Sequence, residues 1–519
     1  MADLKVEDIE HVESSPAPGK LGAEAMDEFH RAEKEITTWQ AIKTHRRVLF
    51  FAILPFVCAA NYGYDTISNN ASIAMPAFIA SFGDVDPTTG SAYLPSLWTS
   101  LWTSMSNLGQ AFGAMAAGAL AQQVGRRWTA LAFSILSIAG TFILFFATSR
   151  GMLLAGKTMN GAVVGGLMTI GTTYAADIAP VRLRGAILQA LVFFGVVMQG
   201  TSMGIVRAFV PNPNPIAWKI VFAIQWAFAV LVLVAALVVP ESPVYLLSKG
   251  KKSQAERALR RIHGPDDPTL PLRLASIAYT LEEEQASQAA SASPLELFRG
   301  SNLKRTLTIA FVMFSTSAIG IPFLSQNIYF LFTVGLPAVH VFDIGIAGFF
   351  LGGLLVVFGW VYNDRIGRRR LWLCGLGGNL IAMVIVGALA FAGTMGSFWA
   401  IGVIMNILIS YTAYANVGVA WTICPEISSH RLRHYSQSVA FITGAVSGWL
   451  FSFITPYMYN VDSGNLGAKT GFVYAGLTVI IAGVSWVLVP ETAGLTVEDI
   501  DLAYETGVRP RAFKKLRSG

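Results

Sequence analysis

Long apolar segments alternate with short polar ones along most of this chain. Each is about as long as the ~20 residues that an α-helix needs to cross a bilayer. Six of them precede a hydrophilic stretch and six follow it, beginning near Val48, Leu94, Trp128, Met152, Ala186, Trp218, Thr306, Ala338, Arg370, Phe398, Ser436 and Thr470. The segments lack strict two-residue alternation, so the pattern predicts twelve membrane-spanning helices and not a β-barrel.

This pattern divides the chain into five regions. We expect a cytoplasmic N-terminal tail at 1–47, a six-helix bundle at 48–240, a cytoplasmic middle loop with short helices at 241–305, a second six-helix bundle at 306–490 and a cytoplasmic C-terminal tail at 491–519. Ala23–Arg47 is typical of a surface helix that leads into the membrane, and Ser253–Ile262 and Leu274–Gln285 have helical patterns. An even number of spans places both termini on one side, and the basic loops identify that side as cytoplasmic.

Composition and charge agree with a membrane setting and exclude other classes. Hydrophobic residues make up 54% of the chain and charged residues 13%, against about 25% charged in a soluble protein. The net charge of +6 does not indicate nucleic-acid binding, because Lys and Arg gather in short clusters between apolar segments, as in cytoplasmic loops. The sequence carries no pattern for a nucleophile, a phosphate loop or a metal centre. We therefore expect a multi-pass protein, most readily of the plasma membrane, with no enzymatic activity, cofactor or metal.

Three charged motifs occur at corresponding places in both halves, which indicates that the halves are repeats. They are Val124–Arg127 and Asp364–Arg370 after the second and eighth spans, Pro240–Ser242 and Pro490–Thr492 after the sixth and twelfth, and Asp177–Gly185 and Glu426–Arg433 after the fourth and tenth. Repeats of this kind enclose a solute site at the bilayer midplane, which opens alternately to each side.

The same residues resemble the sugar porter family of the major facilitator superfamily. The most diagnostic pieces are Pro240–Pro243, Asp364–Arg369 and Pro490–Asp501, and the resemblance covers nearly the whole chain from Gly63-Tyr64-Asp65 onward. Gly507–Lys514 and Trp218–Ile220 look like the fungal α-glucoside (maltose-type) permeases. The resemblance implies an all-α membrane protein with the major facilitator fold, twelve transmembrane helices in two six-helix bundles, that works as a monomer on a small-molecule cargo.

The loop motifs are candidates for a conformational latch at the cytoplasmic ends of the helices. Arginines there can form bidentate pairs with carboxylates when that side is closed. The candidate latch residues are Arg126, Arg127, Asp177, Arg184, Glu241, Asp364, Arg368, Arg369, Glu426, Arg433 and Glu491. Gln122 and Gln123 stand where the family has an acidic residue, so we expect a weaker latch in the first half. The alternative is that these arginines only fix topology.

Asp65 lies well inside the first apolar segment. Burying an unpaired carboxylate there costs several kcal/mol of free energy. Lys157, near the start of the fourth span, is its expected partner. In the sugar porter family an acid and a base at these positions form the proton-coupling pair, although the base is more commonly Arg. The alternatives are that the two residues only lock two helices together, or that transport is uncoupled.

The resemblance also supplies candidate cargo-binding residues. Gln199 and Trp421 match positions that line the sugar site in the family, and Asn327 and Tyr329 face a gate on the seventh span. Thr316 and Ser317 stand where sugar porters carry amide side chains, and Pro322 replaces an Asn. Val192 and Gly444 mark two further lost amides. Each lost amide removes two donors and an acceptor, so we expect a cavity less polar and roomier than a hexose site.

Two functions remain open at this point. The first is a proton-coupled importer of a sugar, glycoside or polyol, which Asp65 and the overall resemblance favour. The alternative is a transporter or exporter of a less polar fungal secondary metabolite, which the missing amides favour. A sugar-sensing receptor with the same fold is a weaker third candidate, because such sensors typically carry a long signalling tail.

Overall fold

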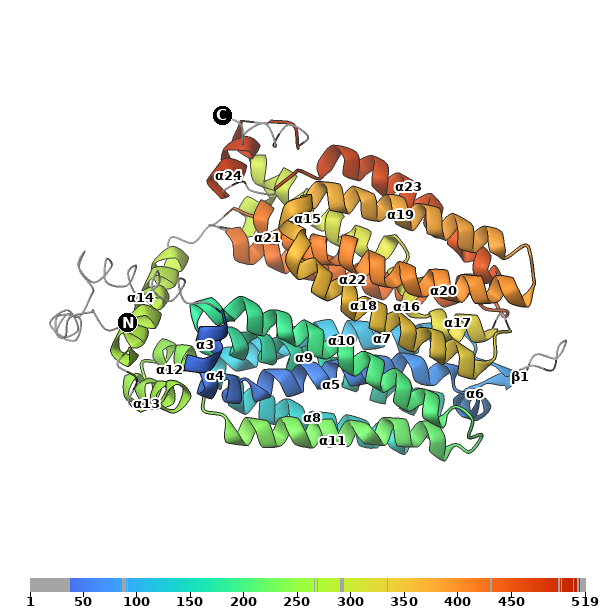
Figure 1. Ribbon diagram of the computed structural model, residues 1–519, viewed down its shortest axis with the longest axis horizontal. Helices are drawn as coiled ribbons and strands as arrows, with labels where there is room; N and C mark the ends of the chain where they lie inside the picture. The colour runs from blue at the N-terminus through green and yellow to red at the C-terminus, as the bar shows by residue number, and fades with distance from the viewer. Residues whose placement is uncertain are drawn as a thin grey trace.

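A computed structural model describes residues 38–85, 90, 92–265, 267, 269–289, 294–333, 335–429, 432–492, 495, 497–506, 508–510 and 513. Within these residues the chain is helical except for loops and two short antiparallel strands, β1 (Asp84–Val85) and β2 (Ala92–Tyr93). The helices form two layers, one from the blue-to-green first half and one from the yellow-to-red second half (Figure 1). This is the all-α, two-bundle architecture that the sequence predicts.

The first bundle consists of long helices that follow each other with short connections. They are α5 (Ile53–Ala71), α7 (Ser96–Gln123), α8 (Arg126–Phe145), α9 (Arg150–Ile178), α10 (Val181–Phe209) and α11 (Ile216–Val238), with the shorter α3 (Thr38–Thr44), α4 (Arg46–Phe51), η1 (Ser72–Ala74) and α6 (Pro76–Phe82) at the ends of α5.

The second bundle repeats this plan with two interrupted helices. It contains α15 (Gly300–Ala318), α16 (Ile321–Ser325), α17 (Asn327–Thr333), α18 (Ala338–Ile366), α19 (Arg368–Leu389), α20 (Met395–Thr412), the π-helical turn η3 (Ala413–Gly418), α21 (Val419–Ile427), α22 (Arg433–Tyr459), η5 (Gly467–Lys469) and α23 (Thr470–Leu488).

Short helices lie at the end of the molecule where α8 and α19 begin (Figure 1). They are α12 (Pro243–Ser248), α13 (Lys252–His263), α14 (Leu270–Ala289), η2 (Pro294–Phe298) and α24 (Val497–Glu505). The expected middle-loop helices correspond to α13 and α14. We call this end the motif end, because the charged loop motifs lie there, and the opposite end, with β1 and β2, the strand end.

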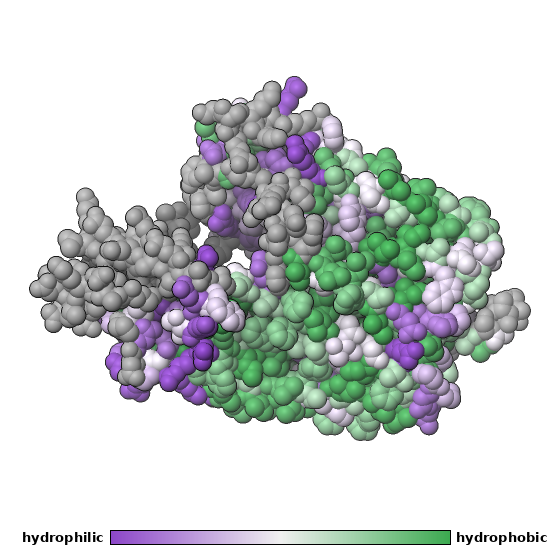
Figure 2. Space-filling view, in the orientation of Figure 1, coloured by the Kyte–Doolittle hydropathy of each residue, from purple (hydrophilic) through white to green (hydrophobic). Residues whose placement is uncertain are grey.

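Ten helical segments of the described chain are long and apolar enough to cross a membrane. The helices α7 and α9 have 28 and 29 residues, and polar and small residues such as Ser, Thr and Gly dilute their apolar character. With these two, each bundle has six spanning helices. Figure 2 shows a broad hydrophobic belt over the helices and hydrophilic side chains gathered toward the ends, as expected of a protein surrounded by lipid.

The seventh span begins earlier and is more irregular than the hydrophobic pattern predicts. Helix α15 begins at Gly300, before the expected Thr306, because the polar residues Ser301 to Arg305 continue the helix beyond the apolar segment. The span then breaks at Gly320, whose φ of 101° ends α15 and starts α16. A side chain at Gly320 would place its Cβ 2.7 Å from the Met383 side chain, so the break requires glycine at this position.

Close approach of α7 and α9 is what holds the first bundle together. A Cβ at Gly113 would lie 1.8 Å from the Ala162 carbonyl oxygen, and one at Gly165 would lie 2.0 Å from the Gln110 carbonyl oxygen. The two backbones are therefore in direct contact, which is how membrane helices associate where no hydrophobic driving force is available.

We predict that Gly113→Ala destabilises the protein, by about 1–3 kcal/mol, because the added methyl group forces α7 away from α9. Thermal unfolding of the purified protein in detergent measures this. Gly118→Ala on the same helix is the matched control, because nothing lies within 4 Å of a Cβ there. Equal melting temperatures for the two variants would contradict the role of this contact.

Candidate functional site

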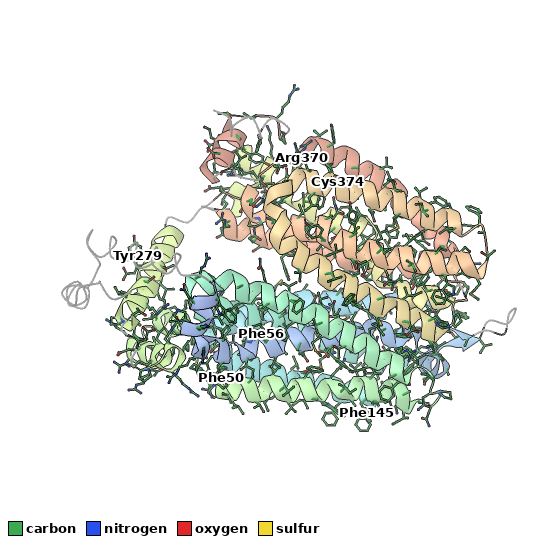
Figure 3. All side chains as sticks on the ribbon, in the orientation of Figure 1. Phe50, Phe56, Phe145, Tyr279, Arg370 and Cys374 are labelled. Carbon is green, nitrogen blue, oxygen red and sulfur yellow. The ribbon has the colours of Figure 1, made fainter. Side chains whose placement is uncertain are left out.

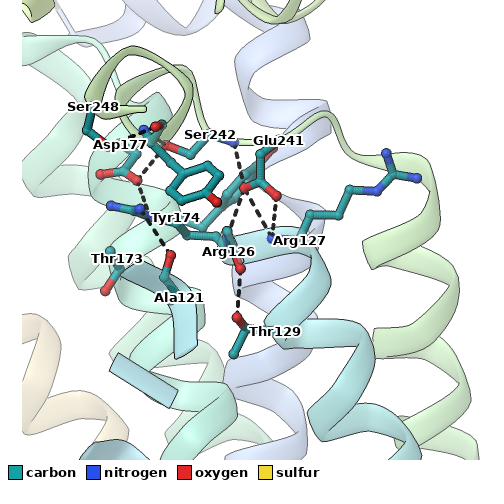
Figure 4. Close-up of polar contacts among 12 residues, drawn as sticks. Ala121, Arg126, Arg127, Thr129, Thr173, Tyr174, Asp177, Glu241, Ser242 and Ser248 are labelled. Carbon is teal, nitrogen blue, oxygen red and sulfur yellow. Dashed lines mark hydrogen bonds and ion pairs between the residues drawn. The ribbon is translucent and has the colours of Figure 1, made fainter. Parts of the chain in front are cut away.

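Glu241 caps the start of α8 at the motif end (Figure 4). Its carboxylate accepts hydrogen bonds from the backbone N–H groups of Arg126 at 2.8 Å and Arg127 at 3.2 Å. The turn before α8 brings the two together: Gly125 has a φ of 105°, and a Cβ there would lie 2.4 Å from a Glu241 oxygen. The negative charge thus lies at the positive end of the helix dipole.

The side chains of the same motif tie α8 to α9 and α11. Arg126 Nε lies 3.0 Å from Asp177 Oδ2 as an ion pair, without the alignment of a hydrogen bond. The Ser242 hydroxyl donates to the same Asp177 oxygen at 2.7 Å. Arg127 donates to carbonyl oxygens at the end of α11, those of Ala236 at 2.9 Å and Leu237 at 3.0 Å. Three helices of the first bundle are therefore joined at one point.

The second bundle repeats this arrangement residue by residue. Glu491 accepts the backbone N–H of Arg368 at 2.9 Å, and Arg368 donates to Glu426 Oε1 at 3.2 Å. Thr492, in the place of Ser242, donates its hydroxyl proton to Glu426. Arg369 donates to the carbonyl oxygens of Trp486 and Val489 at the end of α23.

Two other candidate latch residues, Arg184 and Arg433, line cavities beside these clusters. Arg184 and Asp177 line a cavity of about 320 Å³ against α12, α13 and α14. Burial in that cavity lowers the pKa of His263 to about 3, so this imidazole is neutral at physiological pH. Arg433 lines a cavity of about 280 Å³ together with Arg368 and Glu426. The side chain of Asp364 lies outside the described part of the structure.

All the described contacts of these motifs join residues of the same bundle. The sequence pairs Arg with acid correctly, but the pairs hold each bundle together and do not connect one bundle with the other in this conformation. The function of the motifs as a latch that closes one side therefore stays a prediction.

The two bundles meet toward the strand end, where they converge in Figure 1. The Tyr329 hydroxyl accepts the backbone N–H of Leu94 at 2.9 Å, and the Asn460 amide donates to the Leu94 carbonyl oxygen at 2.7 Å. Asp462 accepts the backbone N–H of Ser96 at 2.8 Å. Tyr329 thus lies where the two bundles meet, beside Leu94, Asn460 and Asp462, which were not found from the sequence, and its function as a gate stays a prediction.

The hydrogen bonds between α7 and α22 lie on the strand-end part of α7. The Asn107 amide donates to the Ser452 hydroxyl at 2.9 Å, and the Arg207 guanidinium at the end of α10 pairs with Asp343 at 2.9 Å. Toward the motif end the bundles diverge (Figure 1). The described conformation is therefore closed at the strand end.

Asp65 and Lys157 are both fully buried in the first bundle, but they do not form an ion pair. Neither Asp65 oxygen has a hydrogen-bond partner among the described residues. The Lys157 ammonium group donates to the Asn69 carbonyl oxygen and lies 5.7 Å from the ring centre of Phe78. The expected pairing of these two residues is absent in this conformation.

Hydrogen-bonded amide side chains lie on the same helices as the two charged residues and on α11. The Asn160 amide, on the helix of Lys157, donates to Gln225 at 3.3 Å, and Gln225 donates to Ser68 at 2.8 Å. The Asn69 amide donates to the Asp65 carbonyl oxygen at 2.9 Å. The sequence analysis missed Asn69, Asn160 and Gln225, although amides inside apolar segments are the signal that identifies them.

The candidate cargo residues differ sharply in how much surface they offer. Thr316 and Ser317 are 8% exposed, and Asn327 and Tyr329 are 4% and 1% exposed. Gln199 is half-buried, whereas Trp421 is 45% exposed. Trp421 follows the π-helical turn η3, an irregularity that is frequent at functional sites.

The hydroxyl groups that replace the family's amides are already engaged within the protein. Thr316 Oγ1 donates to the Met313 carbonyl oxygen in its own helix at 2.6 Å. Ser317 Oγ accepts a hydrogen bond from the Ser447 hydroxyl at 3.3 Å. Each hydroxyl group therefore has fewer donors and acceptors left for a bound molecule than the amide that it replaces.

Comparisons with known proteins agree with this architecture. A family model described as sugar (and other) transporter matches residues 51–504. The MFS transporter fmqE of Aspergillus fumigatus is 67% identical over 100% of this chain and 98% of that protein. The general alpha-glucoside permease of Saccharomyces cerevisiae is 27% identical over 94% of this chain and 80% of the permease. Among solved structures, the inward open conformation of the xylose transporter XylE from E. coli has a TM-score of 0.70 at 20% identity, covering 88% of this chain and 99% of that one, which establishes the fold.

We predict that Glu241→Ala destabilises the protein by about 1–2 kcal/mol, because it leaves the first N–H groups of α8 without an acceptor. Thermal unfolding of the purified protein measures the loss. Glu282→Ala, which removes an exposed carboxylate from α14, is the control and leaves the melting temperature unchanged. If both variants melt like the parent, the capping role is wrong.

Proposed function

Because the chain belongs to the sugar transporter family of the major facilitator superfamily, we propose that it moves a small organic molecule less polar than a hexose across a membrane. Membership in this family makes the chain a multi-pass membrane transporter and not an enzyme. The cargo class is the part that we infer. It corresponds to the second of the two functions left open by the sequence, a less polar fungal secondary metabolite.

The observation that carries this proposal is the engagement of the hydroxyl groups at the amide positions. A sugar presents many hydroxyl groups, and a site that binds it must supply matched donors and acceptors, since unpaired buried polar groups cost free energy. Thr316 already donates its hydroxyl proton within its own helix, and Ser317 accepts a hydrogen bond from the Ser447 hydroxyl. Trp421 is the candidate with a large exposed surface, and an aromatic face suits an apolar or aromatic cargo.

The relatives support the same choice. The full-length relative at 67% identity carries a general transporter name without a sugar in it. The permeases named for α-glucosides are related at 26–27%. A shared fold does not transfer a cargo, so the closer relationship has the greater weight.

Transport is expected to be driven by protons in this proposal. Asp65 and Lys157 are fully buried, and the carboxylate has no hydrogen-bond partner among the described residues. A carboxyl group that gains and loses a proton as its surroundings change can couple proton movement to transport. Both residues lie in the first bundle, so the expected step is a local rearrangement that moves the Lys157 ammonium group from the Asn69 carbonyl oxygen to Asp65. The protein would act as a monomer, with the motif end and both termini in the cytoplasm and the plasma membrane as its location.

A ligand screen tests the cargo class. We expect ethyl acetate extracts of filamentous fungal cultures, which concentrate less polar metabolites, to raise the melting temperature of the purified protein. A ligand at 100 times its Kd stabilises the folded state by about 2.7 kcal/mol. Maltose, glucose and sorbitol should have no effect. Stabilisation by one of these sugars and by no extract would overturn the proposal in favour of sugar transport.

We predict that Trp421→Ala abolishes that stabilisation by the active extract, while Trp421→Phe retains most of it, because the aromatic face supplies the contact. Trp399→Ala, at another exposed tryptophan in the same bundle, is the control. A response of Trp421→Ala equal to that of the parent would remove Trp421 from the cargo site.

We predict that Asp65→Asn abolishes cargo accumulation driven by a pH gradient in proteoliposomes but retains exchange without a gradient. The amide has a similar shape and carries no titratable proton. Asp84→Asn, at an exposed carboxylate that pairs with Arg150, should transport normally. Full accumulation by Asp65→Asn would contradict proton coupling through this residue.

A further inference from the structure

The motif end of the first bundle carries a dense cluster of exposed basic side chains. Three are on α3 and α4, namely Lys43, Arg46 and Arg47. Six are on or just before α13, namely Lys249, Lys251, Lys252, Arg257, Arg260 and Arg261. Glu256 is the one carboxylate in the sequence segments 38–52 and 248–265 that contain them. We call this cluster the basic face.

Two contacts fix the basic face at the level where spanning helices end. Arg261 donates to the carbonyl oxygen of Val238, the last residue of α11, at 2.8 Å, and its guanidinium lies 5.7 Å from the ring centre of Phe51. Arg47 lies beside Gly264, the residue that ends α13. Because α11 ends at the edge of the hydrocarbon region, α13 lies at the depth of the lipid headgroups.

Exposed aromatic side chains surround the basic face. Trp39 is 66% exposed, Trp128 is 59% exposed and Phe50 is 58% exposed. Figure 3 shows Phe50 at the motif end of the first bundle. The Lys43 ammonium group lies 5.6 Å from the ring centre of Trp39, and the Arg127 guanidinium lies 5.7 Å from that of Trp128. Aromatic side chains of this kind anchor proteins at the membrane surface.

Among the described residues at the same end of the second bundle, acidic side chains accompany the basic ones. Its α24 carries Asp499, Asp501 and Glu505, and Arg305 pairs with Asp501. In Figure 2 the hydrophilic side chains around α13 adjoin the hydrophobic belt directly. The rule that cytoplasmic loops are positive would apply to both bundles, so it does not by itself explain the concentration of charge on the first.

We propose that the basic face binds the headgroups of anionic phospholipids in the adjoining leaflet. Guanidinium groups pair with phosphate through two parallel hydrogen bonds, and juxtamembrane Lys and Arg residues are attracted to anionic lipids at close range. The site is preformed, since Arg261 is held by Val238 and Phe51. This inference does not depend on the cargo.

The binding site has a mechanical consequence. Helix α13 packs against α12 and α4, and α12 begins directly after Ser242, which is bonded to Asp177. Lipid bound to the basic face therefore contacts short helices that are joined to the Asp177 cluster of the first bundle.

The acidic N-terminal segment is the competing occupant. Residues 1–37 contain ten Asp or Glu and four Lys or Arg, so this segment is complementary in charge. The position of the basic face at the headgroup level, with its aromatic border, favours lipid.

Native mass spectrometry of the full chain tests the proposal. The protein is incubated with an equimolar mixture of phosphatidylserine and phosphatidylcholine, and the ratio of retained lipids is measured. The variant Lys251→Gln, Lys252→Gln, Arg257→Gln removes three charges from the basic face. We expect the preference for phosphatidylserine to fall by at least ~10-fold. Each charge removed lowers the affinity for anionic lipid by roughly fivefold, before screening by salt.

The matched control removes three exposed charges from the second bundle at the same end, as Arg299→Gln, Lys304→Gln, Arg370→Gln; Figure 3 shows Arg370 there. It should retain the preference of the parent. Equal losses in the two variants would show a simple charge effect and overturn the proposal. Absence of any preference in the unmodified protein, as occupation by residues 1–37 predicts, would also overturn it. Equal melting temperatures establish that all three proteins are folded.

Discussion

A polar side chain inside a membrane protein has no water to bind in the hydrocarbon region and must find a partner within the protein. In this chain, the charged loop motifs meet that constraint inside each bundle. Glu241 and Glu491 accept the first N–H groups of α8 and α19. Arg126 and Arg368 pair with the acids at the ends of the neighbouring helices. These contacts therefore do not depend on the position of the other bundle.

The polar contacts that the structure describes between the bundles lie toward the strand end. They include hydrogen bonds to the backbone near Leu94, the Asn107 to Ser452 bond and the Arg207 to Asp343 pair, beside the packing of α7 against α22 and of α10 against α18. The bonds at the membrane surface can exchange with water at little net cost. The expected motion is a rocking of two rigid units that opens the strand end and closes the motif end.

The sequence predicts the fold well because the hydrophobic segments alone determine twelve helices, and the repeated motifs determine the two halves. In the structure, equivalent motif residues make equivalent contacts in the two halves, with Thr492 in the place of Ser242 and Glu426 in the place of Asp177. Partners that depend on long-range packing could not be predicted from the sequence. It predicts that Lys157 pairs with Asp65, whereas in this conformation the Lys157 ammonium group donates to the Asn69 carbonyl oxygen. It identifies Thr316 and Ser317 as candidates for either cargo binding or packing, and their hydrogen bonds with Met313 and Ser447 are visible only in the structure.

The central claim is that two rigid bundles rock about contacts at the strand end. Spin-label distance measurements test it directly, in a Cys374→Ser background that removes the exposed thiol. One label pair replaces Gln122 and Arg370 at the motif end, and another replaces Asn212 and Ser463 at the strand end. We expect two distance populations for each pair, and conditions that shorten the motif-end distance should lengthen the strand-end distance. A single unchanged distance at both ends, in a protein that still transports, would contradict the account.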